Sequence, residues 1–162
     1  MLLLLFLLGL ALGPVSPSDD KQVMLQRGSC PMFWYGFNGR CYKYVASPMT
    51  WADAELYCVS QKVNLVSIHS LNEDNFIQAL IKNFDHLEGR TWIGLSDIHK
   101  EGSWMWSDGS TVDFSFWSTG EPNNRGGNEH CVHANYDQYR KWNDYQCFAT
   151  YPSVCASRVT CL

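Results

Sequence analysis

The chain has 162 residues, of which 46% are hydrophobic and 14% aromatic, and its formal net charge is −4. This length allows one ordinary domain with its own core, and the aromatic content excludes an intrinsically disordered chain, because such chains lack apolar surface to bury. The acidic balance argues against a general nucleic-acid binder, since those proteins carry basic patches that neutralise phosphate.

The N-terminus is predicted to be a secretory signal peptide, residues 1–18, with cleavage between residues 13 and 18. The first twelve residues are almost wholly apolar. Such a run spans only about 18 Å as a helix, short of the roughly 30 Å hydrocarbon core of a bilayer, so a signal peptide fits better than a membrane anchor. A short polar segment, 19–29, follows and carries no coiled-coil or collagen pattern. We therefore expect a secreted, soluble protein without a membrane anchor.

Seven cysteines follow the signal, and in a secreted chain they indicate a disulfide framework. They are Cys30, Cys41, Cys58, Cys131, Cys147, Cys155 and Cys161. Three bridges would use six of them, but counting alone does not determine the pairing. A cysteine zinc site is disfavoured because the sequence has no closely spaced CxxC pair.

The first predicted element of the domain is an aromatic hairpin from Cys30 to Val45. Its two halves are rich in Phe, Trp and Tyr, and Asn38-Gly39 between them is a turn signal. Cys30 and Cys41 are near in sequence, which suggests that they close this hairpin.

Two helices with one buried face each are predicted next. Thr50 followed by Asp53, and Ser70 followed by Glu73, are capping-box signals for the two helix starts. The apolar positions recur at helical spacing and are Trp51, Ala54 and Cys58 in the first helix and Phe76, Ile77, Leu80 and Ile81 in the second. We expect both apolar faces to belong to the core.

From Thr91 onward the pattern changes to strands and loops. A buried-strand run at 92–95, and strands at 131–136 and 153–157 on either side of Trp142-Asn143-Asp144, are predicted. With the helices they indicate an α+β domain of short antiparallel strands. Residues 115–130 are rich in Gly, Asn, Ser and Glu, and a loop of this length inside a compact domain is usually functional.

The long loop and the segment after it carry three carboxylates and two amide carbonyls. They are Glu121, Asn123, Glu129, Asn143 and Asp144. Hard oxygen ligands in this number suit Ca²⁺, which takes six to eight of them, whereas zinc prefers nitrogen and sulfur. Any one of these residues alone would be interpreted as solvated surface; their combination predicts a calcium site that fails in acid as the carboxylates protonate.

Taken together, Trp92-Ile93-Gly94-Leu95, Glu121-Pro122-Asn123, Trp142-Asn143-Asp144 and six cysteines resemble the C-type lectin-like domain, over residues 30–157. Within that family the chain is also similar to the lactose-binding skin-mucus lectins of eels. The resemblance implies the long form of the domain, with a long irregular loop region for calcium and sugar. It also implies the bridges Cys30–Cys41, Cys58–Cys155 and Cys131–Cys147.

The resemblance further implies that the same five residues hold one Ca²⁺ and bind the sugar, with a cis bond between Glu121 and Pro122. A second calcium position of the family is matched by Asp97, Glu101 and the shared Glu129. Asn124 and His130 stand there in place of the usual acidic residues. Because two negative charges are missing, we expect one bound calcium rather than two.

Two features of the sequence predict different sugars. In the family, Glu-Pro-Asn goes with mannose-type sugars, yet the similar eel lectins include lactose binders, some of which act without calcium. We expect a mannose-type site, with calcium-independent binding of β-galactosides such as lactose as the alternative. A further alternative is a domain that binds protein or ice and no sugar. The implied partners are glycans on microbes or cells, which the protein would agglutinate in innate defence at a body surface.

An enzyme is not expected, because no nucleophile motif is present, and His130 and His133 would face opposite sides of a strand. Cys161 remains in the tail, residues 158–162, once three bridges are assigned. Either it is a free or capped thiol or it joins two chains. We expect a disulfide-linked homodimer.

Overall fold

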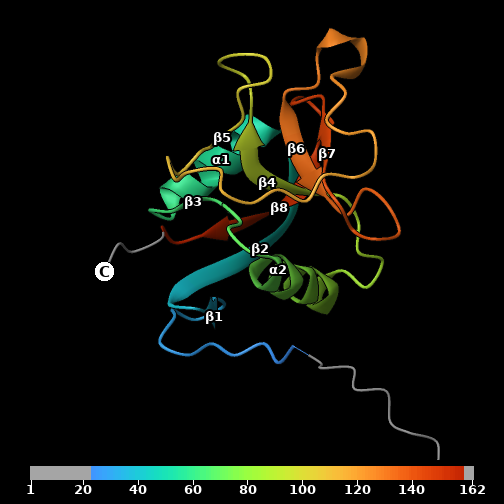
Figure 1. The fold of residues 1–162 in the computed structure, drawn as a ribbon. Coiled ribbons are helices and arrows are strands. Elements are labelled where there is room, and N and C mark those ends of the chain that lie inside the picture. Colours follow the sequence, from blue (N-terminus) through green and yellow to red (C-terminus); the bar gives the residue numbers. More distant parts are fainter. Residues whose placement is uncertain (1–22, 159–162) are drawn as a thin grey trace, which may run out of the picture.

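The aromatic hairpin is present in the computed structural model, which describes residues 23–158 (Figure 1). Strands β1 (Tyr35–Phe37) and β2 (Arg40–Met49) pair antiparallel. Asn38 and Gly39 between them have φ values of 46° and 76°, as a two-residue hairpin turn requires. The predicted signal peptide and Cys161 lie outside the described residues.

Both predicted helices form, α1 at Trp51–Ser60 and α2 at Leu71–Phe84. The Thr50 side chain accepts from the Asp53 amide, and the Ser70 side chain accepts from the Glu73 amide. In a full capping box the Glu73 carboxylate would accept from the Ser70 amide. It instead accepts from the His69 amide at 2.6 Å and pairs with buried Arg40. A buried guanidinium needs a counter-charge, and this need outweighs local capping.

The strands form one eight-stranded sheet in the order β1-β2-β8-β4-β6-β7, with β3 beside β8 and β5 beside β4. The remaining strands are β3 (Asn64–Leu65), β4 (Thr91–Ser96), β5 (Met105–Trp106), β6 (Cys131–Ala134), β7 (Asn143–Tyr145) and β8 (Tyr151–Ala156). The two helices and the sheet confirm the predicted α+β fold. Two details differ from the sequence prediction: β4 and β8 run parallel, and Asn143-Asp144 lie within a strand rather than between strands.

Each helix buries its apolar face in its own hydrophobic cluster. The α2 residues pack with Tyr42, Trp106 and Trp142, whereas the α1 residues pack with Trp92 and the Cys58–Cys155 bridge. The described residues contain the three disulfides that the resemblance implied, Cys30–Cys41, Cys58–Cys155 and Cys131–Cys147. The first closes the hairpin, the second links α1 to β8, and the third links β6 to the segment after β7.

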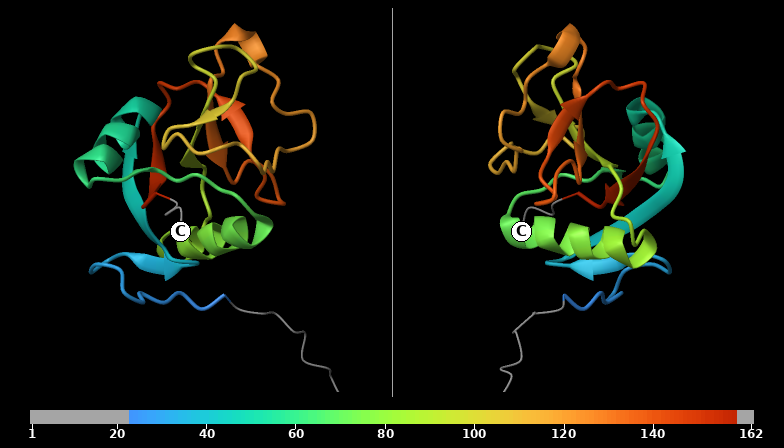
Figure 2. Two further views of the ribbon diagram at one scale, coloured as in Figure 1. Left: turned by 60° about the vertical axis from the view of Figure 1, so that its left-hand side comes forward. Right: turned by 90° about the vertical axis from the view of Figure 1, so that its right-hand side faces the viewer.

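The long loop lies at one end of the domain. Figures 1 and 2 show α2 at one end and the short 3₁₀ helix η1 (Arg125–Gly127) at the other, with β4, β6 and β7 leading toward η1. These strands support the loop, and a site supported by strands is held rigid.

Within residues 23–158, no helix is both long and apolar enough to span a bilayer.

A buried carboxylate on α2 supports the strand that enters this site. Asp74, 1% exposed, accepts a hydrogen bond of 3.0 Å from Trp142 Nε1, and Trp142 directly precedes β7. Burial raises the pKa of Asp74 to about 6, an effect that neighbouring Glu73 adds to and the Trp142 bond opposes.

Asp74→Asn is expected to change how stability depends on pH. The folded pKa lies above the unfolded value of about 3.9. Folding therefore takes up a proton between these values, and stability falls as pH rises through that window. Asn keeps an acceptor for Trp142 without the charge, so the variant should match the wild type near pH 3. Above pH 7 it should exceed the wild type by up to about 3 kcal/mol.

Urea unfolding of both proteins across pH 3–8 measures this difference. A stability difference that stays constant with pH would contradict the assigned titration of Asp74.

Candidate functional site

The five predicted calcium ligands come from two segments, and the Asp144 carboxylate joins them. Its Oδ1 accepts from the Asn123 amide at 3.1 Å and its Oδ2 from the Asn124 amide at 2.7 Å. Asp144 is fully buried on β7. Strand β7 thus anchors the loop that carries Glu121 and Asn123.

Glu121 presents an unsatisfied carboxylate oxygen. The Glu121-Pro122 bond is cis, in agreement with the resemblance. Glu121 Oε1 accepts from Asn123 Nδ2 at 3.1 Å, whereas Oε2 is buried and has no hydrogen-bond partner among the described residues. A buried, unpaired carboxylate oxygen is costly unless a cation or donor meets it.

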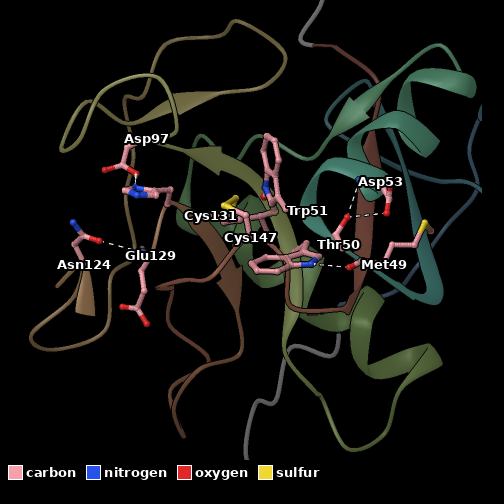
Figure 3. The surroundings of a disulfide bond; sticks show 12 residues. Met49, Thr50, Trp51, Asp53, Asp97, Asn124, Glu129, Cys131 and Cys147 are labelled. Atoms are coloured by element: carbon pink, nitrogen blue, oxygen red, sulfur yellow. Dashed lines mark hydrogen bonds and ion pairs between the residues drawn. A yellow bond between two sulfur atoms is a disulfide. The ribbon is translucent and has the colours of Figure 1, made fainter. Parts of the chain in front are cut away.

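Glu129 lies at the other end of the loop and is 6% exposed. Its Oε2 accepts from the Arg125 amide at 2.9 Å, and its own amide donates to Asn124 Oδ1 at 3.1 Å, the contact drawn in Figure 3. These two bonds close the loop on itself through η1. They fix the position of Glu129 relative to Asn124 and Arg125.

The carboxylates of this cluster repel one another. Burial raises the pKa of Glu121 to about 7, and the charges of Asp144 and Glu129 add to the rise. Burial also raises the pKa of Glu129, with a further contribution from Asp144. A divalent cation would relieve this repulsion, and every ligand offered is an oxygen. The residues present therefore fit Ca²⁺.

His133 orients the fifth candidate ligand, a role that the sequence did not reveal. It pairs across the sheet with Asn143 and is fully buried, which lowers its pKa to about 4 and keeps the ring neutral at pH 7. Its Nδ1 lies 3.0 Å from the Ala134 carbonyl, so Nδ1 carries the proton and Nε2 is the acceptor. Asn143 Nδ2, at 3.3 Å, donates to Nε2, which directs the Asn143 carbonyl oxygen away from the ring.

The residues of the second calcium position also come together. Asp97, Glu101 and His130 each offer a ligand atom, and these atoms lie within 4.8 Å of one another. His130 Nδ1 is 3.0 Å from Asp97 Oδ1 and 3.3 Å from Glu101 Oε2. Figure 3 shows the side chains of Asp97 and Glu129 pointing in different directions, and Glu129 is not among the three residues that come together here.

Two hollows in the described surface bear on ligand binding. One of about 440 Å³ borders the loop and is lined by Arg125, Gly126, Asn128, Glu129, Tyr145 and Gln146. Another of about 590 Å³ lies between the β1–β2 hairpin, the start of α2 and residues 108–113. Only the first includes a candidate calcium ligand.

The chain is similar to known proteins in sequence and fold. The family model of the C-type lectin domain matches residues 47–157. "Lactose-binding lectin l-2" of Anguilla japonica is 45% identical over 139 residues, covering 83% of this chain and 82% of that protein. A "C-type lectin mannose-binding isoform" of Oxyuranus scutellatus is 39% identical over 132 residues, covering 80% and 84%. The structure of herring type II antifreeze protein has a TM-score of 0.74 and 33% identity, covering 81% of this chain and all of that one.

Proposed function

Because the chain belongs to the C-type lectin domain family, we propose that it is a secreted lectin that binds sugar through one calcium ion. Its fold and relatives are those of carbohydrate-binding lectins rather than of enzymes. The proposed ligands are Glu121, Asn123, Glu129, Asn143 and Asp144. The observation that carries the proposal is the buried, unpartnered Oε2 of Glu121 in a cluster of mutually repelling carboxylates.

The side chains of this site have complementary roles toward a sugar diol. A bound calcium ion supplies coordination positions for two adjacent hydroxyl groups. The carboxylates of Glu121 and Glu129 accept hydrogen bonds from these hydroxyl groups, in the stronger, charge-assisted class of hydrogen bond. Each Asn amide nitrogen has two hydrogens, so Asn143 can donate to His133 and still donate to a hydroxyl.

We propose a mannose-type sugar as the preferred ligand. Glu at 121 and Asn at 123 stand in the order that the family uses for sugars whose 3- and 4-hydroxyls are both equatorial. The relative from Oxyuranus scutellatus, which is described as mannose-binding, supports this choice. Of the proposed ligands, Glu129 borders the hollow of about 440 Å³ beside Tyr145.

Calcium-independent lactose binding is the second candidate. It is favoured by the 45% identity to a lectin described as lactose-binding. The larger hollow would be its location, since it combines aromatic side chains with hydrogen-bonding groups, as pockets for small molecules do. Ice binding is the third candidate, favoured by the likeness to the herring antifreeze protein.

Affinity chromatography separates these candidates. The mature protein is passed over mannose-agarose and lactose-agarose in calcium and then washed with a chelator. Retention on mannose with release by the chelator is the expected result. Retention on lactose that survives the chelator would overturn the calcium site as the main sugar site, and no retention on either resin would favour the ice- or protein-binding candidates.

We further propose that Cys161 joins two chains. The three disulfides use six of the seven cysteines, and the seventh lies outside the described residues. Thiols readily oxidise in secreted settings. Two linked sites would crosslink cell-surface glycans with an avidity that single sites lack.

Cys161→Ser is accordingly expected to yield a monomer that binds a monovalent sugar unchanged but no longer agglutinates cells. Non-reducing electrophoresis and a haemagglutination titre measure the two effects. A variant that still migrates as a covalent dimer, or a wild type that migrates as a monomer, would contradict the proposed bridge.

A further inference from the structure

The cluster at the second calcium position is unsuited to calcium. Calcium takes six to eight oxygen ligands, whereas Asp97 and Glu101 bring only two carboxylates and His130 brings a nitrogen. Asn124, which stands where the family has an acidic residue, uses its side-chain oxygen to accept from the Glu129 amide. The chain has therefore lost the oxygen-rich surroundings that calcium requires.

The same three groups match the preferences of a smaller ion. Imidazole together with carboxylates suits Zn²⁺ and its neighbours among the transition metals. Bonds of about 2.0–2.2 Å in a tetrahedron place neighbouring ligand atoms roughly 3.3–3.5 Å apart. The His130 nitrogen lies 3.0 Å from the Asp97 oxygen and 3.3 Å from the Glu101 oxygen, so small shifts would admit the ion.

Part of this cluster is held in place without any ion. The Asp97 side chain is fully buried, and its Oδ2 accepts from the Gly102 amide at 2.8 Å. The Asp97 amide donates to the His130 carbonyl at 3.1 Å, which fixes the two backbones against each other. Asp97 Oδ1 is thereby directed at the His130 ring, and the exposed Glu101 contacts the same ring nitrogen.

We propose that Asp97, Glu101 and His130 form a binding site for a divalent transition metal, with Zn²⁺ as its probe. The two carboxylates and the neutral imidazole give a net charge of zero with the metal bound, and the exposed side of the cluster leaves a fourth position to water. Asp97 and Glu129 point in different directions (Figure 3), so Glu129, a proposed calcium ligand, is not part of this site.

Calorimetric titration of the mature chain with ZnCl₂ tests the site, in a non-chelating buffer that contains millimolar Ca²⁺. We expect saturable binding of one Zn²⁺ per chain. His130→Gln should weaken it by roughly tenfold or more, since it removes the nitrogen ligand. His86→Gln is the matched control, because it removes an exposed histidine outside the cluster.

Two further variants test whether the Zn²⁺ binds elsewhere on the chain. Cys161→Ser should bind Zn²⁺ like the wild type; loss of binding there would assign the metal to a thiol and overturn the proposal. Glu121→Gln should also leave Zn²⁺ binding unchanged, which separates this site from the proposed sugar site. Absence of saturable binding to the wild type would overturn the proposal and leave His130 as a hydrogen-bond partner of the two carboxylates.

Discussion

Glu121→Gln is expected to weaken calcium-dependent sugar binding strongly and to leave the fold intact. The substitution keeps the size of the side chain and an acceptor for Asn123, so the loop keeps its shape. It replaces the unpartnered Oε2, or its equivalent, with an amide group that repels a cation. Since ligand charge sets calcium affinity, the calcium dissociation constant should rise by at least roughly tenfold.

Thermal unfolding provides a second measurement of the same effect. Calcium at about 100 times its dissociation constant stabilises the wild type by about 2.7 kcal/mol. At that calcium concentration, a variant with tenfold weaker binding gains only about 1.4 kcal/mol. In the absence of calcium, Glu121→Gln should be more stable than the wild type, because the variant lacks one of three mutually repelling carboxylates.

Asp113→Asn is the matched control for this experiment. It removes one negative charge from an exposed side chain that contacts His69 and lies outside the loop. Calcium titration and mannose binding should be unchanged in this variant. Equal losses in Asp113→Asn and Glu121→Gln would mean that general charge, and not a ligand at 121, controls binding.

The local parts of the fold could be predicted from the sequence because their causes are local. Thr50 and Ser70 cap helices through amides three residues away, and Asn38-Gly39 adopts the positive φ values of its turn. The role of Glu73 could not be predicted, since its partner Arg40 is 33 residues away in sequence. The parallel pairing of β4 with β8 is equally non-local.

The same distinction applies to the candidate site. Glu121, Asn123 and Glu129 fall in one loop, so composition and motif identified them together. His133 has no such signal: its partner Asn143 becomes its neighbour only when β6 and β7 pair. At His130 the sequence revealed only the loss of an acidic ligand, whereas the structure places its ring nitrogen beside Asp97 and Glu101.

The second large effect is expected for Arg40→Met, in the core of the domain. Arg40 is 5% exposed. Its guanidinium donates to the Ser157 and Ser67 carbonyls, both at 2.9 Å, and pairs with Glu73. Those contacts join β2, the start of α2 and the end of β8. Methionine fills much of the same volume but leaves the Glu73 carboxylate, 6% exposed, without its counter-charge.

Removal of one partner of a buried ion pair typically costs about 3–5 kcal/mol, because the remaining charge stays desolvated. Arg40→Met should therefore lower the melting temperature by roughly 10 °C in a domain of this size. The hydrogen bond of 2.6 Å from the Tyr42 hydroxyl to Glu73 cannot replace a positive charge. Differential scanning calorimetry and urea unfolding measure the loss.

Two comparisons separate the ion pair from other causes. Arg27→Met makes the same change at an exposed position and should cost little. Adding Glu73→Gln to Arg40→Met removes the stranded charge and should recover part of the stability, because a neutral amide is less costly to bury than a carboxylate. If the double variant were no more stable than Arg40→Met, packing around the guanidinium, and not its charge, would be what stabilises this junction of β2, α2 and β8.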